Sequence, residues 1–99
     1  MHNLLTGKQK RFLRKEAHHL NPIFQVGKDG VNENMIHQIE DALEKRELIK
    51  VSILQNCFED KHSVAEQLVE GAGAELVQII GNIIVLYKES EENKTLELP

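Results

Sequence analysis

The sequence predicts an α/β fold, a two-layer sandwich with a four-stranded mixed sheet and the element order α-β-α-β-α-β-β. Apolar residues recur at helical spacing in three segments, and four short segments are rich in β-branched residues. Helices and strands alternate along most of the chain, as in folds built from β-α-β units. A length of 99 residues with 40% hydrophobic side chains allows one small core. We therefore expect a single domain over residues 1–88, followed by an acidic tail over residues 89–99.

The first predicted helix covers residues 4–20. Thr6 and Gln9 have the spacing of a capping box, and the dipeptide Asn21-Pro22 ends the helix because the residue before proline disfavours helical angles. Phe12, Leu13 and Leu20 share one side. The other side spreads five basic residues over roughly 160°: Lys8, Lys10, Arg11, Arg14 and Lys15.

The next unit is a strand over residues 23–26, a loop over residues 27–30 and a second helix. Asn32 is placed to cap this helix, with Val31 and Ile36 as a hydrophobic staple. The inward stripe consists of Ile36, Ile39 and Leu43. The β-branched residues of segment 48–54 predict the second strand.

The third helix begins at Asp60 or Ser63 and ends at Gly71 and Gly73. Residues 76–80 and 83–87 then form a hairpin, because a glycine first in a two-residue loop suits a type II′ turn. Each β-α-β unit should cross over in the right-handed sense between parallel strands, and the hairpin adds an antiparallel strand. The tail from residue 88 onward is expected to fray, with Leu96 and Leu98 as the residues able to dock locally.

Charge is distributed unevenly along the chain. The net charge of −4 hides a segment 1–30 with six basic and two acidic residues, and a remainder with six basic and 14 acidic residues. Binding of polyanions depends on local potential, so the basic first helix can bind phosphate on an acidic protein. A charged helix face is often merely solvated, but such faces normally mix signs, and no acid occurs between Lys8 and Lys15.

The loop Gly27-Lys28-Asp29-Gly30 is the second candidate for phosphate binding. Its two glycines allow positive φ angles and a close approach of the backbone to a ligand. The following helix supplies unpaired N–H groups, and Lys28 supplies a cation. An ordinary tight turn would have the same four residues. The acidic Asp29 is unfavourable for phosphate binding. We nevertheless expect the loop to form one continuous positive surface with the first helix.

Several blocks of sequence, in this order, resemble the CRM domain (chloroplast RNA splicing and ribosome maturation), in its single-domain bacterial YhbY-type form. They are Leu5-Thr6-Gly7-Lys8-Gln9-Lys10-Arg11, Ala17-His18, Pro22-Ile23, Val26-Gly27-Lys28-Asp29-Gly30-Val31, Leu48-Ile49-Lys50-Val51, Gln78-Ile79-Ile80-Gly81 and Val85-Leu86-Tyr87. The resemblance covers residues 4 to about 88.

The resemblance implies an RNA-binding domain similar in fold to the C-terminal domain of translation initiation factor three. It also implies ribosomal RNA in precursors of the large ribosomal subunit as the partner. The RNA-binding residues that it implies are the GxxG loop and the nearby basic surface: Lys8, Lys10, Arg11, Arg14, Lys15, Gly27, Lys28, Asp29 and Gly30. The acidic Asp29 and a pI near 5.7 depart from what phosphate binding favours.

Other function classes have weaker support in the sequence. Cys57 and His62 lack an oriented third group, so no catalytic set emerges and we expect no enzyme. The histidines have no metal-ligand spacing, and we expect neither a metal nor another cofactor. Of four aromatic residues, Phe58 is the one whose polar surroundings allow exposure, so a stacking platform of several rings is not expected.

Location and association follow from simple counts. The longest apolar stretch, residues 76–87, is shorter than the roughly 20 residues of a membrane-spanning helix, and no apolar signal core follows the N-terminus. The single cysteine fits a reducing compartment, so a cytoplasmic location is expected. Nothing in the sequence requires a dimer, so a monomer is expected. The alternative function is a protein-interaction adaptor whose acidic second helix and tail dock basic ribosomal proteins.

Overall fold

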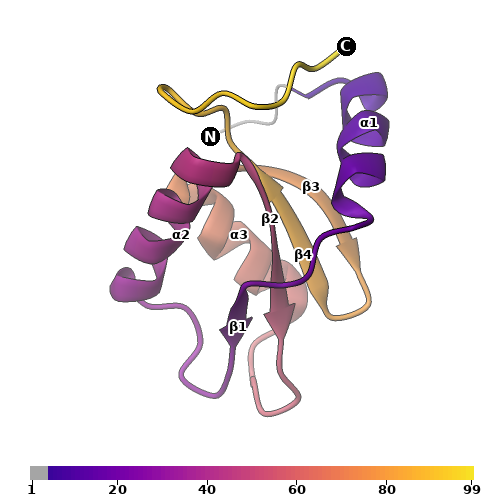
Figure 1. Ribbon diagram of the computed structural model, residues 1–99. Coiled ribbons are helices and arrows are strands. Elements are labelled where there is room, and N and C mark those ends of the chain that lie inside the picture. Colours follow the sequence, from indigo (N-terminus) through magenta and orange to yellow (C-terminus); the bar gives the residue numbers. More distant parts are fainter. Residues whose placement is uncertain (1–4) are drawn as a thin grey trace.

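The computed structural model describes residues 5–99 and shows three helices and a four-stranded sheet (Figure 1). In chain order the elements are α1 (Gly7–Ala17), β1 (Phe24–Val26), α2 (Glu33–Arg46), β2 (Leu48–Ile53), α3 (Lys61–Ala72), β3 (Glu75–Ile80) and β4 (Ile83–Tyr87). The predicted α/β class and element order are therefore confirmed. The first four residues, including the predicted helix start at residue 4, lie outside the described part of the chain.

The sheet has the order β1-β2-β4-β3, so the last strand lies inside it. β1 pairs with β2 in parallel, and β4 is antiparallel to both of its neighbours. The sheet is thus mixed, as predicted. α3 connects β2 to β3, which run in the same direction but are separated by β4.

The main core lies between the sheet and the pair α2 and α3. Ile39 and Leu43 of α2 and Leu68 of α3 are fully buried, together with Ile84 and Leu86 of β4. Ile36, the third member of the predicted stripe, is half-buried at the edge of this core. The helices come especially close at Gly71, where an added Cβ would lie 2.6 Å from Ile36 Cδ1. Gly71 therefore lies inside α3, and the prediction that it helps to end this helix is wrong.

α1 packs on the opposite face of the sheet and adds a partial third layer to the two that the sequence predicts (Figure 1). Leu13 and Ala17 of α1 pack with Val85 and Tyr87 of β4. Alternate residues of a strand point to opposite faces, and every residue of β4 is apolar or aromatic. Both faces of this central strand therefore need a cover, and α1 supplies the second one.

Local signals placed most helix ends correctly. The Thr6 hydroxyl accepts the Gln9 N–H at 3.1 Å and the Gln9 side chain accepts the Thr6 N–H at 3.0 Å, which confirms the capping box. Asn32 caps α2, and Gly73 ends α3 in the left-handed conformation. α1 stops at Ala17 instead of residue 20, because the chain turns there toward Pro22; Leu20 is consequently 36% exposed.

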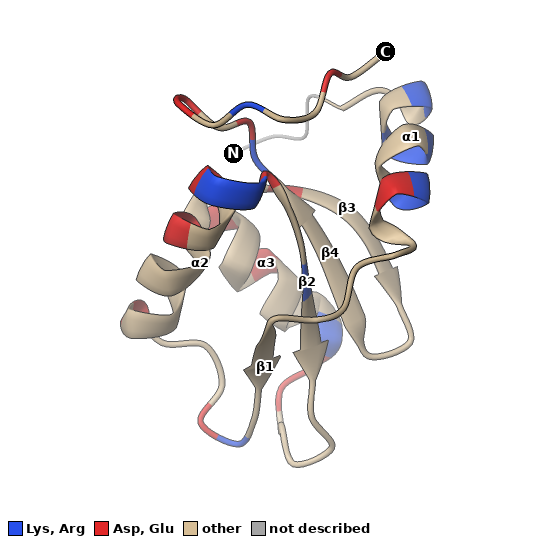
Figure 2. Cartoon of the chain, viewed as in Figure 1, with Lys and Arg blue, Asp and Glu red and all other residues tan. Residues whose placement is uncertain are grey.

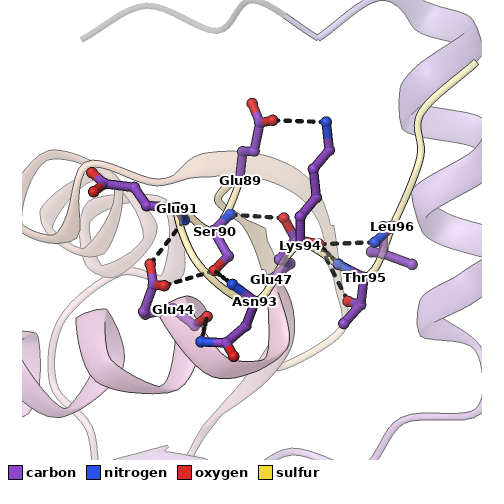
Figure 3. A network of polar contacts seen from close by, with 9 residues as sticks. All are labelled: Glu44, Glu47, Glu89, Ser90, Glu91, Asn93, Lys94, Thr95 and Leu96. Atoms are coloured by element: carbon purple, nitrogen blue, oxygen red, sulfur yellow. Dashed lines mark hydrogen bonds and ion pairs between the residues drawn. The ribbon is translucent and has the colours of Figure 1, made fainter.

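The C-terminal tail is docked, so the expectation that it frays is wrong. It runs back over the C-terminal end of α2 toward α1 (Figures 1 and 3). The Glu44 carboxylate accepts bonds from the Ser90 hydroxyl at 2.7 Å and from backbone N–H groups of the tail. Leu96 and Leu98 pack against the α1 side of the sheet, as the sequence had allowed. The acidic tail thus binds an acidic helix mainly through its backbone donors, which composition alone does not reveal.

Candidate functional site

The basic face of α1 is the strongest concentration of like charge in the described structure (Figure 2). Lys8, Arg11 and Lys15 are exposed, whereas Lys10 and Arg14 are half-buried. Within residues 5–99 no ion pair involves any of these five side chains. The buried side of the same helix, at Leu13 and Ala17, fixes the orientation of this face toward solvent.

The helix dipole adds to this positive potential. The first turn of α1 has no acidic residue and contains Lys8 and Lys10, although negative side chains stabilise the N-terminal turn of a helix. Arg14 and Lys15 in the last turn are favourable for the helix. The cations of the first turn therefore lower the stability of the helix. This cost indicates a role other than stabilising α1, and binding of an anionic ligand is such a role.

The GxxG loop, residues 27–30, forms a tight turn between β1 and α2. The Gly30 N–H donates to the Gly27 carbonyl oxygen at 3.0 Å. Gly30 has φ +67, whereas Gly27 does not have a positive φ. Positive φ angles were expected at both glycines of the loop, and the structure has one at Gly30 alone. Lys28 and Asp29 are exposed at the tip, and Lys28 has no ion pair within the described chain.

A second loop, residues 54–60 between β2 and α3, lies directly against the GxxG loop. The Leu54 N–H donates to the Val26 carbonyl oxygen at 2.9 Å, which joins the two loops where they begin. A Cβ at Gly27 would lie 3.4 Å from Asn56 Oδ1, and a Cβ at Gly30 would overlap the Glu59 carboxylate. Two carboxylates, those of Asp29 and Glu59, therefore lie at the GxxG loop, and its surroundings are less positive than those of α1.

The two predicted phosphate sites lie at separate ends of the molecule (Figure 2). α1 packs over β3, β2 and β4, and the GxxG loop follows β1, at the edge of the sheet opposite to β3. The expected continuous positive surface is therefore wrong, because it depended on a strand order that local sequence does not specify. Lys50 of β2 lies on the α1 face of the sheet, and its ammonium donates to the Leu20 carbonyl at 3.0 Å.

Phe58 is the functional candidate that the sequence reasoning undervalued. Its ring is 88% exposed in the loop beside the GxxG turn. A phenylalanine surrounded by polar residues was the available signal, and the predicted exposure is confirmed. What sequence could not show is that the loop of Phe58 lies against Gly27 and Gly30.

The candidates for other chemistry make ordinary structural contacts. Cys57 is half-buried, and its Sγ contacts the Glu59 carbonyl oxygen at 3.8 Å. The His62 backbone N–H bonds to the Asp60 carboxylate, which caps α3. Across residues 5–99 no group of three or more His, Cys, Asp or Glu side chains is arranged to hold a metal ion. None of the helices described here has the length and apolar character needed to cross a bilayer.

Comparison with known proteins agrees with this architecture. Residues 5–88 match the model of the CRS1 / YhbY (CRM) domain. The chain is 74% identical to "Probable RNA-binding protein YqeI" of Bacillus subtilis over 97% of this chain and 100% of the relative. It is 44% identical to a protein of Haemophilus influenzae named "RNA-binding protein", over 96% and 95% of the two chains.

A solved structure shows the same fold. The solution structure of SAV1595 from Staphylococcus aureus matches with a TM-score of 0.81 and 64% sequence identity, covering 97% of this chain and 100% of that one. Fold and site thus define a class of small α/β domains. Its features are a four-stranded mixed sheet, a basic first helix and a GxxG loop. The protein belongs to the CRS1/YhbY (CRM) domain family.

Proposed function

We propose that this protein binds RNA without catalysing a reaction, and that its ligand is ribosomal RNA in precursors of the large ribosomal subunit. The observation that carries the proposal is the basic face of α1, five cations on one short helix with no acidic partner in residues 5–99. Phosphates of an RNA backbone are the polyanion that suits such a face. Relatives that are 74% and 44% identical are named as RNA-binding proteins.

The acidic remainder of the molecule supports an oriented complex. Acidic side chains gather on α2 and α3, which cover one face of the sheet, and α1 lies on the other face (Figure 2). A polyanion is repelled by the first surface and attracted by the second, so one orientation is favoured on approach. The choice of ribosomal RNA rests on the resemblance of the sequence to the YhbY-type form of the CRM domain.

The separation of α1 from the GxxG loop defines the kind of RNA that can contact both. The molecule is 37 Å long and 25 Å across in the other two directions, so the ligand must present phosphates along much of one side. A folded RNA with a helical stem meets this requirement, and its backbone is recognised by shape and charge. With about four to six phosphates bound, the slope of log affinity against log salt should lie near −3 to −5.

The test is a titration of a large-subunit ribosomal RNA fragment at several salt concentrations. The variant Arg11→Ala/Lys15→Ala should weaken binding about tenfold or more and reduce the salt slope by about 2. The matched control Lys45→Ala/Arg46→Ala removes the same two residue types from exposed positions on α2. Equal affinities of the two variants would contradict the assignment of the site to α1.

An adaptor that docks basic ribosomal proteins is the second candidate function. A pocket of about 640 Å³ between α2 and α3 favours it, because Glu33, Glu40 and Glu70 line this pocket around Ile36. A lysine- or arginine-rich segment would complement these carboxylates. The variant Glu40→Lys/Glu70→Lys should then abolish association with ribosomal particles and leave the affinity for naked RNA unreduced. Retained association in this variant would rule the adaptor out.

A further inference from the structure

Phe58 is far more exposed than any other large hydrophobic residue described in the structure. Its exposed fraction is 88%, against 56% for Ile80 and 42% for Ile23. Isolated apolar residues at the surface are common, but a phenylalanine with 88% of its surface exposed gains little from burial in the fold. The position of the ring therefore matters more than the exposure itself.

The ring lies where ligands commonly bind in α/β folds. β1 and β2 are parallel, so the GxxG loop and the loop of Phe58 both leave the carboxyl ends of their strands. Figure 1 shows these two loops side by side at one end of the molecule. The Leu54–Val26 backbone bond and the packing of Glu59 against Gly30 hold them together.

The loop that presents Phe58 is ordered by its own contacts. The Cys57 N–H donates to the Leu54 carbonyl at 3.0 Å, which closes a turn just before the ring. On the other side, the Glu59 carboxylate accepts a 2.6 Å bond from the Gln67 amide. A ring held between two anchored residues loses little freedom when a ligand covers it.

We propose that Phe58 stacks against an unpaired base of the bound RNA, while Lys28 contacts a phosphate of the same strand at the GxxG loop. The inference rests on the proposed function and adds an unpaired nucleotide to the helical RNA bound at α1. Stacking on one ring requires a base with a free face, which a duplex does not offer.

The polar groups around the ring suit a base edge better than a backbone. Asn56 and Glu59 lie within two residues of Phe58 in the same loop, and their side chains lie against Gly27 and Gly30. A carboxylate such as Glu59 accepts from the amino group of a base, and an amide both donates and accepts. Asp29 and Glu59 weaken a pure phosphate site at the GxxG loop. Binding of a base edge explains the presence of such acids, because a carboxylate accepts hydrogen bonds from base amino groups. Cys57 and Glu59, the chain neighbours of Phe58, also line a polar pocket of about 590 Å³.

The experiment uses two RNA probes that differ only in unpaired bases. One is a hairpin with a flush end, and the other is the same hairpin with a single-stranded extension of a few adenosines. The wild-type protein should bind the extended probe more tightly, and Phe58→Ala should lower that affinity by roughly 5- to 100-fold without changing the affinity for the flush hairpin. Phe58→Tyr should retain the difference, and Ile80→Ala serves as a control for loss of an exposed apolar side chain.

A tryptophan reporter checks the contact directly. The chain has no tryptophan, so Phe58→Trp places a single emitter at the site. Its fluorescence should be quenched by the extended probe and remain unchanged with the flush hairpin. Equal affinities of wild type and Phe58→Ala for the extended probe would overturn the inference. If Phe58→Ala in addition lost its association with ribosomal particles, the ring would be assigned to protein docking.

The same titrations separate this inference from the proposed function. If Arg11→Ala/Lys15→Ala weakens binding of both probes and Phe58→Ala weakens neither, only the stacking inference is wrong. If the wild-type protein binds neither of the two probes and also fails to bind ribosomal RNA, the proposed function and the stacking inference are both wrong. Because the Phe58 side chain is exposed, the melting temperature of Phe58→Ala should match that of the wild type.

Discussion

The carboxylate of Glu47 accepts a hydrogen bond of 2.7 Å from the backbone N–H of Ser90, 43 residues further along the chain (Figure 3). Its other oxygen accepts bonds from the Thr95 and Leu96 N–H groups at 2.7 and 2.9 Å. Glu47 is fully buried and forms no ion pair among the described residues. It also has φ 66, an unusual angle for a residue other than glycine. The tail contacts compensate this backbone strain.

Replacing Glu47 should therefore destabilise the whole domain. In Glu47→Gln the amide has one acceptor oxygen and turns an N–H₂ group toward donors, so we expect a loss of about 2–3 kcal/mol in the free energy of unfolding. Urea denaturation measures this value. Glu70→Gln, at an exposed position on α3, is the matched control and should change stability by less than about 0.5 kcal/mol. Similar values for both variants would mean that the tail contributes little.

Acid should release the tail. Burial by itself raises the pKa of Glu47, but hydrogen bonds from Ser90, Thr95 and Leu96 outweigh it, so the pKa falls below the ordinary 4.5. The Ser90 hydroxyl and neighbouring N–H groups likewise lower the pKa of Glu44. A carboxyl group with a lower pKa in the folded state stabilises fully above pH 4.5 and loses this contribution as pH falls through the folded-state pKa.

Thermal denaturation between pH 3 and pH 7 checks this dependence. The melting temperature should change little down to about pH 5 and then fall, and the fall should be shallower in Glu47→Gln. An equally steep fall in that variant would assign the acid sensitivity to other carboxyl groups.

The two glycines of the GxxG loop should respond differently to alanine. Gly30→Ala forces a side chain into positive φ and against the Glu59 carboxylate, so a loss of about 1–2 kcal/mol is expected. Gly27→Ala meets only ordinary contacts with Asn56 and should cost less than about 0.5 kcal/mol. Equal unfolding free energies of the two variants would contradict the described loop conformation.

Charge reversal on α1 should separate stability from binding. Lys8→Glu places an acid in the first turn and should stabilise the helix by about 0.3–1 kcal/mol, while it weakens RNA binding. Lys15→Glu, in the last turn, should weaken RNA binding and also destabilise the helix. Melting temperatures and salt-dependent titrations of the pair test both effects. Tighter RNA binding by Lys8→Glu would show that phosphates do not contact this end of α1.

Local sequence predicted the elements well and their arrangement less well. The capping box at Thr6, the cap at Asn32 and the turn at Gly81 act through neighbours within four residues, so the chain itself displays them. The position of β4 depends instead on pairing of Val51 with Ile84, which are distant in sequence. That pairing decides which end of the sheet carries each candidate site.

The docked tail was hidden for a related reason. Its partners Glu44 and Glu47 have the same charge sign as most of its charged side chains, and the contacts use backbone N–H groups that every residue except proline has. Only the candidate site residues on α1 could be recognised from charge and periodicity alone. The pairing of the GxxG loop with the loop of Phe58 required the three-dimensional structure.

The central position of β4 also governs when the protein can fold during its synthesis. A ribosome releases the chain from its N-terminus, and until residues 83–87 have left the exit tunnel β2 has only β1 to pair with, while β3 has no neighbour. Both cores require side chains of β4. The nascent chain must therefore stay largely unstructured until that strand emerges, and then complete both faces of its sheet in a single cooperative step.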